Sequence, residues 1–325
     1  MTKQFEHPKR HAANHEIDRA ARRARRPSRR ARRAKSTALS AVERTRAHAL
    51  MSLDVIDRNA TQDASSTRFL EQRLKLEDDA RAFARDHRGA RPRLFTGLCA
   101  DVPAVRSWMD VEAFERAGAG SRTCTLSSRA ADGRAFIKAD CEKDESGTFE
   151  EACEKVFVRR ERVYARAELV ASMASASGVE RVSEIFGEEA KLRNCGVWFG
   201  AAGNVTPLHY DLCHGFLVQV RGVKTFTVYH PDDWRAMAPR KNRPELSRIN
   251  LDKYLNGDAE EREKYPRFAA VAPVGTFTLN PGDVLYTPPF FWHHVRTHDE
   301  EPAISVLVPF DPSPDEPIHV CHLYG

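Results

Sequence analysis

The chain of 325 residues has room for one large domain or two small ones, and a hydrophobic content of 41% is enough for a sizeable core. Its seven cysteines stand singly, without a CxxC pair, so neither a zinc ribbon nor a disulfide framework is indicated and we expect a reducing compartment. Since no apolar run approaches the length of a membrane span and no secretory segment follows Met1, we expect no membrane partner.

The first 60 residues are predicted to be a basic tail without a fold of its own. Residues 1–35 carry a net charge of +10 and the whole chain +5, so residues 36–325 carry −5. Such a tail cannot bury enough apolar surface to fold alone. The run from Arg19 to Arg33 predicts nuclear import or contact with nucleic acid or chromatin, and therefore a nuclear rather than a cytoplasmic location. A solvated tail and an organellar transit peptide are the alternatives.

The remaining chain divides into three predicted parts: a helical lead-in over residues 61–92, a folded domain over 93–315 and a C-terminal end over 316–325. Apolar residues at helical spacing predict a helix from Ser66 to His87, and a short helix fits residues 38–57. The start of the domain is expected to hold further elements: a strand over 92–98, a helix over 111–116 and a polar loop over 140–147.

A capping box marks the next helix. Thr148 followed by Glu151 predicts a helix start, and the helix should run to about Val158, although periodicity alone lets it continue to Ala174. A helix over 179–193 and a strand over 196–199 are expected to follow.

The run from Gly203 to Tyr229 is rich in Val, Thr, Phe and Tyr, which is typical of strands. On a strand, His209 and Asp211 point to the same face, and Leu208 and Tyr210 to the other. An imidazole and a carboxylate placed this way are half of a metal site. The pattern alone is weak, because a surface strand can carry two such polar residues.

A third metal ligand is expected near the end of the chain, in PGDVLYTPPFFWHHVRT. If residues 292–297 form a strand, His293 shares the less polar face with Val295, and His294 shares the other with Arg296. His293 is therefore the better candidate ligand, and His294 is expected to be exposed or hydrogen-bonded.

Lys224 follows a predicted hairpin turn at Gly222 and alternates with Phe226 and Val228. A lysine on an apolar strand face needs an anion opposite it, because burying a lone ammonium is costly. No acidic residue lies nearby in sequence, so the anion could be a ligand. The alternative is a lysine whose ammonium reaches the rim of the sheet.

Two histidines and one carboxylate form a facial triad, which is typical of non-haem Fe(II) and leaves three coordination positions open. A 2-oxo acid with a distal carboxylate could chelate the iron and meet Lys224 with its far end. After residue 231 a long polar insertion runs to 267, and its sequence lacks strand character. Short strands are then expected over 269–274, 276–279, 284–287, 292–297 and 303–310, which argues for an antiparallel barrel or sandwich.

Three motifs, GNVTPLHYD, FLVQVRGVKTFTVYHPDDW and PGDVLYTPPFFWHHV, resemble the JmjC and cupin-like 2-oxoglutarate- and Fe(II)-dependent oxygenases. Among these, the chain is similar to the asparaginyl hydroxylase that inhibits the hypoxia-inducible factor. The resemblance implies that Fe(II) is bound by His209, Asp211 and His293. It implies that the co-substrate 2-oxoglutarate is bound by Lys224, Thr206 and Tyr164.

The resemblance also implies a mainly β fold with flanking helices, built on a double-stranded β-helix of the cupin or jelly-roll type. It implies a chain break near Arg160 and a strand over 162–166, and it places the polar insertion beside the substrate groove. The chain departs from the family at His214 and Gly215, where a glutamine-asparagine pair is common, and at Leu307, where an asparagine is usual. These departures bear on substrate choice.

The expected activity is that of a dioxygenase that decarboxylates 2-oxoglutarate to succinate while it hydroxylates a protein side chain. Demethylation of a histone lysine and oxidation of an RNA are alternatives within the family. Outside it, a non-catalytic cupin-like binding module and a metal-dependent isomerase are the alternatives; the isomerase would have no need of Lys224.

Overall fold

The computed structural model describes residues 64–121, 124–128 and 143–319. The chain divides into two units, Met1–Glu71 and Gln72–Gly325, and the second holds both β-sheets. The predicted basic tail and the short helix over 38–57 lie outside the described residues. None of the described helices combines the length and apolar character needed to cross a membrane.

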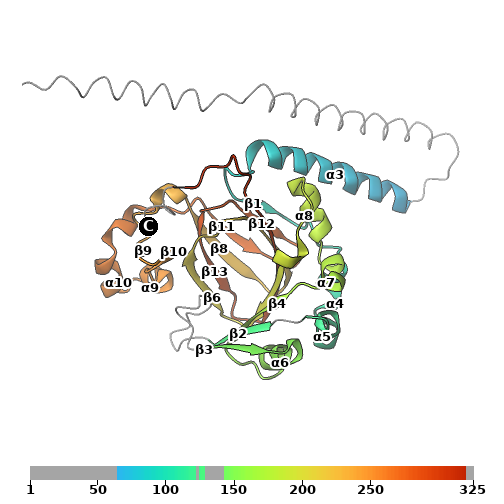
Figure 1. The fold of residues 1–325 in the computed structure, drawn as a ribbon, viewed down its shortest axis with the longest axis horizontal. Helices are drawn as coiled ribbons and strands as arrows, with labels where there is room; N and C mark the ends of the chain where they lie inside the picture. The colour runs from blue at the N-terminus through green and yellow to red at the C-terminus, as the bar shows by residue number, and fades with distance from the viewer. Residues whose placement is uncertain (1–63, 122–123, 129–142, 320–325) are drawn as a thin grey trace, which may run out of the picture. The chain divides into compact units, whose positions relative to one another are not determined.

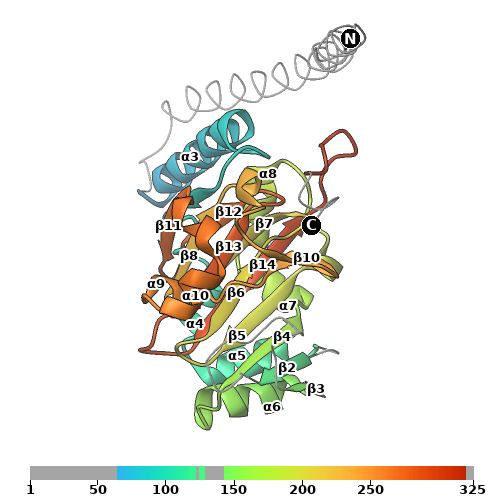
Figure 2. The ribbon, with the colours of Figure 1, turned by 90° about the vertical axis from the view of Figure 1, so that its left-hand side faces the viewer.

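Two antiparallel sheets form the body of the domain (Figures 1 and 2). The larger has the strand order β1-β12-β7-β14-β5-β4-β2-β3, with bounds β1 (Arg93–Phe95), β12 (Val284–Thr287), β7 (His214–Arg221), β14 (Ala303–Phe310), β5 (Gly196–Gly200), β4 (Val163–Glu168), β2 (Cys124–Ser128) and β3 (Lys143–Gly147). The smaller has the order β11-β8-β13-β6-β10-β9, with bounds β11 (Gly275–Leu279), β8 (Lys224–Tyr229), β13 (Trp292–Thr297), β6 (Val205–His209), β10 (Arg243–Ser247) and β9 (Pro239–Arg240). The predicted mainly β, jelly-roll class is confirmed.

The helices are short apart from α3 (Ala64–Asp86), whose prediction is confirmed. The others are α4 (Pro103–Ser107), α5 (Val111–Gly118), α6 (Phe149–Cys153), α7 (Ala171–Ala176), α8 (Val179–Phe186), α9 (Leu251–Leu255) and α10 (Ala259–Lys264). Short turns of other helix types are η1 (Glu154–Val158), η2 (Leu192–Asn194), η3 (Pro231–Asp233) and η4 (Pro266–Ala270).

Apolar side chains fill three layers. The outer face of the larger sheet packs on helices, where Phe83 of α3 is fully buried and its ring lies 5.5 Å from Phe216 and 4.7 Å from Tyr286. Burying a phenylalanine in this way stabilises the fold by about 1.5–3 kcal/mol. The space between the sheets holds a second cluster, which includes Phe226 and Leu285. We call the sheet surfaces that face this space the inner faces.

The third layer lies on the outer face of the smaller sheet. Trp292 and Tyr210 are buried there against the insertion that contains α9 and α10. The insertion was expected to lack strands, and this was wrong: β9 and β10 lie within it, and β10 pairs with β6. The insertion therefore covers the part of this outer face that holds Trp292 and Tyr210.

Several boundaries differ from the prediction for identifiable reasons. The helix expected over 179–193 ends at Phe186, because Gly187 takes a left-handed conformation with φ 83° and stops it. The expected loop over 140–147 ends in the strand β3, which pairs with β2. Residues 269–274 do not form the expected strand, since η4 occupies the start of that stretch.

The elements next to the motifs follow the prediction more closely. The capping box is present, with the Glu151 amide donating to Thr148 Oγ1 at 3.0 Å, and the helix continues through η1 to Val158. The expected break falls at Arg160, which has a positive φ of 55°, and β4 follows it. Gly222 has the expected positive φ, but its turn is not a hairpin: β7 and β8 belong to different sheets.

Candidate metal centre

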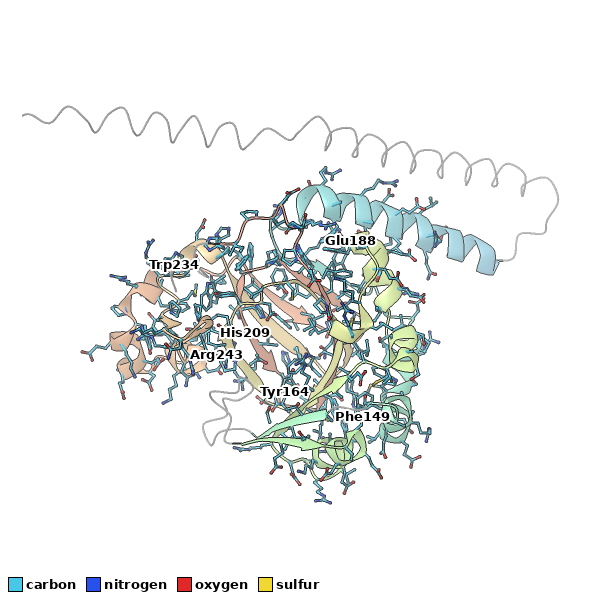
Figure 3. All side chains as sticks on the ribbon, in the orientation of Figure 1. Phe149, Tyr164, Glu188, His209, Trp234 and Arg243 are labelled. Atoms are coloured by element: carbon cyan, nitrogen blue, oxygen red, sulfur yellow. The ribbon has the colours of Figure 1, made fainter. Side chains whose placement is uncertain are left out.

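His209, Asp211 and His293 come together on the inner face of the smaller sheet. One potential ligand atom from each lies within 4.8 Å of the others, and the two imidazole rings are 4.2 Å apart at their centroids. His209 ends β6 and pairs in register with His293 on β13. Figure 3 shows His209 in the middle of the strands, whereas Trp234 lies out on the insertion.

Asp211 lies just beyond the strand, which corrects the expectation that it shares a strand face with His209. Its position is fixed by its backbone carbonyl, which accepts a 2.8 Å hydrogen bond from the amide of Phe290. Phe290 holds a left-handed conformation with φ 66°, which is unfavourable for a residue with a bulky side chain. The carboxylate is placed by this strained turn, and not by strand geometry.

Both histidines are oriented by the same local hydrogen bond. His209 Nδ1 lies 2.8 Å from the carbonyl of Pro207, and His293 Nδ1 lies 3.0 Å from the carbonyl of Phe291. A carbonyl can only accept, so each Nδ1 carries the proton and each Nε2 keeps its lone pair. This is the tautomer that a metal ion requires.

The electrostatics also favour a cation. Burial, together with the neighbouring His209, lowers the pKa of His293 to about 4, so this imidazole is neutral at pH 7. His293 Nε2 faces Asp211 Oδ2 at 3.7 Å. Two imidazole nitrogen donors and one carboxylate make the donor set of a facial triad, so the residues present fit Fe(II).

A bulge in β6 brings Thr206 into the same cavity. On β13, His293 and Val295 are two residues apart. Their partners on β6, His209 and Thr206, are three residues apart, so β6 holds one extra residue between the two pairs. Without this irregularity, Thr206 would point to the outer face with Leu208. The bulge lets both Thr206 and His209 face inward.

Lys224 is buried on the inner face, with 2% of its surface exposed. Its Nζ donates to the hydroxyl of Tyr164 at 3.3 Å across the space between the sheets, and a side-chain hydrogen bond joins Tyr164 to Thr206. Among the described residues no carboxylate forms an ion pair with Lys224, and desolvation lowers its pKa to about 7. The structure thus brings Thr206, Tyr164 and Lys224 together around one buried ammonium.

No motif or spacing in the sequence singles out the residues that hold Tyr164. Its ring packs against Trp198 at 5.2 Å. A Cβ atom on Gly200 would lie 2.4 Å from the Tyr164 ring and 2.2 Å from Asn204 Nδ2, so only glycine fits there. Asn204 is buried, and its Oδ1 has no hydrogen-bond partner in the part of the chain that the structure describes.

Two other histidines near the motifs do not join the ligands. His294 faces outward, and its Nε2 lies 3.5 Å from Asp252 Oδ2, which agrees with the hydrogen-bonded alternative. His214 points away from the metal into the helical layer, where Nδ1 contacts the Tyr286 hydroxyl at 2.8 Å. His214 therefore has no direct contact with the candidate ligands, and its bearing on substrate choice stays a prediction. The other two departures from the family, Gly215 and Leu307, lie next to each other: a Cβ atom added to Gly215 would be 3.8 Å from Leu307 Cδ1.

The family model for the cupin-like domain matches residues 80–316, which is most of the chain. The chain belongs to the cupin-like domain family. The membership expected from the motifs is therefore confirmed, and the curated relatives include JmjC-domain proteins.

Jumonji C domain-containing protein 5 of Drosophila melanogaster is 37% identical over 109 residues, which is 34% of this chain and 25% of that protein. Lysine-specific demethylase 8 of Xenopus tropicalis is 32% identical over 108 residues, 33% of this chain and 23% of that protein. The matched part is thus about a quarter of the length of these relatives. The solved structure of E. coli ycfD aligns with a TM-score of 0.47 and 16% identity over 72% of this chain and 53% of that one.

Proposed function

We propose that this cupin-like protein is an Fe(II)- and 2-oxoglutarate-dependent dioxygenase that hydroxylates a protein side chain. The observation that carries the proposal is the pairing of two features on one inner face: three metal-ligand side chains and a buried lysine without an anionic partner. An ammonium buried in this way is costly unless a ligand supplies the opposite charge. A dicarboxylate that reaches from the metal to Lys224 meets both requirements.

Each residue then has a physical role. His209, Asp211 and His293 would hold Fe(II) and leave positions open for the co-substrate and dioxygen. Lys224, with the hydroxyls of Tyr164 and Thr206, would bind the distal carboxylate of 2-oxoglutarate through charge-assisted hydrogen bonds. When bound, the iron and 2-oxoglutarate supply the oxidising chemistry, in which one oxygen atom of O₂ enters succinate and the other enters the substrate.

The substrate would approach where the metal site is open. The Asp211 side chain is 43% exposed, and the next residue, Leu212, is 47% exposed. An exposed leucine beside a metal ligand offers apolar contact to a polypeptide. The name of the Xenopus relative, a lysine-specific demethylase, favours a protein substrate and keeps demethylation of a methyl-lysine as a second candidate at the same site.

Release of succinate tests the proposal. Protein with Fe(II), 2-oxoglutarate and ascorbate should release succinate when cell-extract proteins are added. His209→Ala should abolish this release and Lys224→Ala should lower it, while Lys241→Ala, which removes an exposed lysine, should leave it unchanged. Mass spectrometry of the extract would then show an added oxygen atom or a lost methyl group. Metal binding without turnover on any protein or nucleic-acid extract would instead identify a non-catalytic binding module.

A further inference from the structure

A cleft with a volume of about 540 Å³ opens where the start of β6 and the outer side of β13 meet the turns next to β4 and β5 of the larger sheet. It lies at the other end of the strand pair that holds the metal ligands: Arg296 pairs with Val205 at the start of β6, whereas His293 pairs with His209 at its end. Residues 293 and 296 are three apart on β13, about 10 Å along the strand, and point to opposite faces. The cleft is therefore separate from the metal centre.

The acidic residues of this cleft are already paired. Asp252 lies 3.5 Å from His294 and 3.7 Å from Arg296, and Asp299 lies 3.2 Å from Arg296. Burial raises the pKa of Asp252, but His294 and Arg296 outweigh this and hold it below its usual value. Both carboxylates of the cleft are thus paired with Arg296, and the four cations and two carboxylates of its lining leave a net charge of +2.

Three cations of the cleft remain uncompensated. The side chains of Arg160, Arg162 and Lys253 line it, and none forms a hydrogen bond or ion pair with another described residue. They come from two distant parts of the chain, the turn before β4 and the helix α9. A concave wall with three free positive charges is an anion-binding surface.

The backbone at Arg160 supports a binding role. Arg160 takes a left-handed conformation with φ 55°, which costs an L-residue with a side chain about 1–2 kcal/mol. The Glu161 amide, bonded to the Lys155 carbonyl at 2.9 Å, holds the turn in place. Strain of this kind persists where the surrounding structure enforces it, and it concentrates at ligand clamps.

We propose that this cleft binds phosphate groups of a nucleic-acid backbone. The volume exceeds that of one phosphate, and arginine forks suit phosphate oxygens. Among the described residues that line the cleft none is aromatic, so they offer no surface for base stacking, and we expect the contact to be independent of sequence. The Arg-rich segment of residues 1–35 predicts the same class of partner from a different part of the chain.

The apolar residues that line the cleft are small, namely Ala201, Ala202, Val205 and Pro302, so an acidic peptide would gain little from its apolar side chains there. The inference does not depend on the proposed oxygenase activity, because binding can be measured without iron or co-substrate.

The test compares two variants of the full chain that lose the same charge. One is Arg160→Gln/Arg162→Gln/Lys253→Gln; the control is Arg106→Gln/Arg193→Gln/Lys264→Gln, three exposed cations outside the cleft. Fluorescence anisotropy with a labelled 20-nucleotide single-stranded RNA is followed from 50 to 300 mM salt. Each phosphate contact on a single strand adds about −0.7 to the slope of log affinity against log salt. Because the cleft variant loses three cations, its slope should be less steep than that of the wild type by about 2. Its affinity at low salt should fall about tenfold, and the control should match the wild type.

Two further measurements keep the result decisive. The double variant Arg162→Gln/Lys253→Gln leaves the strained residue in place and should lose about 1.4 from the slope, which serves if the triple variant does not fold. Cross-linking of 4-thiouridine RNA should label peptides around residues 160–162 and 250–256. Equal weakening in both triple variants, cross-links confined to residues 1–35, or equal displacement of the RNA by poly-glutamate would each overturn the proposal.

Discussion

The two faces of β13 carry similar residues in opposite circumstances. On the inner face His293 is buried away from water. The ammonium of Lys224 on the adjacent strand is also buried, and it donates a hydrogen bond to the neutral hydroxyl of Tyr164. On the outer face His294 is equally buried but lies against Asp252, which Arg296 also contacts. His294 is therefore paired within the protein, whereas the buried ammonium of Lys224 has no anionic partner among the described residues.

The two faces should differ most when one histidine is removed from each of them. His293→Ala should lower metal-dependent succinate release by about 100-fold or more, because changes even to the partners of metal ligands cost 10–100-fold. His294→Ala should retain metal binding, although Asp252 would keep only Arg296 as a partner, at a cost of about 1 kcal/mol of stability. Thermal shifts with Mn(II) and the succinate assay report both effects. Equal loss of metal binding in the two variants would contradict the assignment of the faces.

The pH dependence of co-substrate binding follows from Lys224. Burial lowers its pKa from 10.5 to about 7, so the free protein loses this proton as the pH rises past 7. A bound carboxylate restores the charged form, and binding therefore takes up a proton above pH 7. The affinity for 2-oxoglutarate, measured by calorimetry with saturating Mn(II), should fall by up to about tenfold per pH unit from pH 7 to 9. An affinity that stays constant over this range would show that Lys224 does not meet the anion.

The unliganded protein should respond to pH in the opposite sense. Its unfolded chain keeps the Lys224 proton up to pH 10.5, whereas the folded protein releases it near pH 7. Because the unfolded state binds more protons in this window, the free energy of unfolding should rise with pH across it.

The support of Tyr164 can be tested with two glycines of β5. Gly200→Ala places a methyl group 2.4 Å from the Tyr164 ring, so the ring must shift. We expect a loss of about 1–3 kcal/mol in stability and a several-fold rise in the KM for 2-oxoglutarate. Gly196→Ala, whose Cβ atom finds its nearest neighbour at 3.5 Å, is the matched control and should change neither. Should Gly200→Ala leave the KM unchanged, Tyr164 would not position the co-substrate.

The smallest effect is expected on the outer face. Asp252→Asn removes the charge that faces His294 and Arg296, and it should cost about 1 kcal/mol without changing turnover. The pKa of Asp252 lies below its usual value in the folded protein. This contribution to stability is therefore present at neutral pH, and it is lost as the pH falls below the pKa of an unperturbed aspartate and through the lower pKa of the folded state. A turnover defect in this variant would mean that the outer layer controls the metal site.

Strand alternation was enough to predict which residues face inward on regular strands. It separated His293 from His294 and placed Lys224 with Phe226, because β13 and β8 pair without irregularity. Alternation fails where the pairing is irregular. Thr206 faces inward only because β6 has a bulge, and Asp211 is held by the turn at Phe290. Neither the bulge nor the turn can be predicted from the local residue spacing. The family resemblance supplied Thr206 where periodicity could not.

Other features depended on contacts between distant residues. Whether the turn at Gly222 made a hairpin or a crossover between sheets depended on the partners of β7 and β8, which lie far away in the chain. The tight fit of Gly200 against Tyr164 and Asn204 was equally hidden. The early end of α8, in contrast, was visible in the sequence as Gly187, a residue that favours a helix C-terminus.

The most direct test of the account is denaturant unfolding of the wild type and Lys224→Met, each with Mn(II) and with or without 2-oxoglutarate. Without co-substrate, the variant should be about 1–4 kcal/mol more stable, because a desolvated amine is replaced by an apolar side chain of similar length. With 2-oxoglutarate, the wild type should gain stability and the variant should not. A less stable variant, or one that 2-oxoglutarate stabilises as much as the wild type, would contradict the claim that the inner lysine is placed to receive an anion.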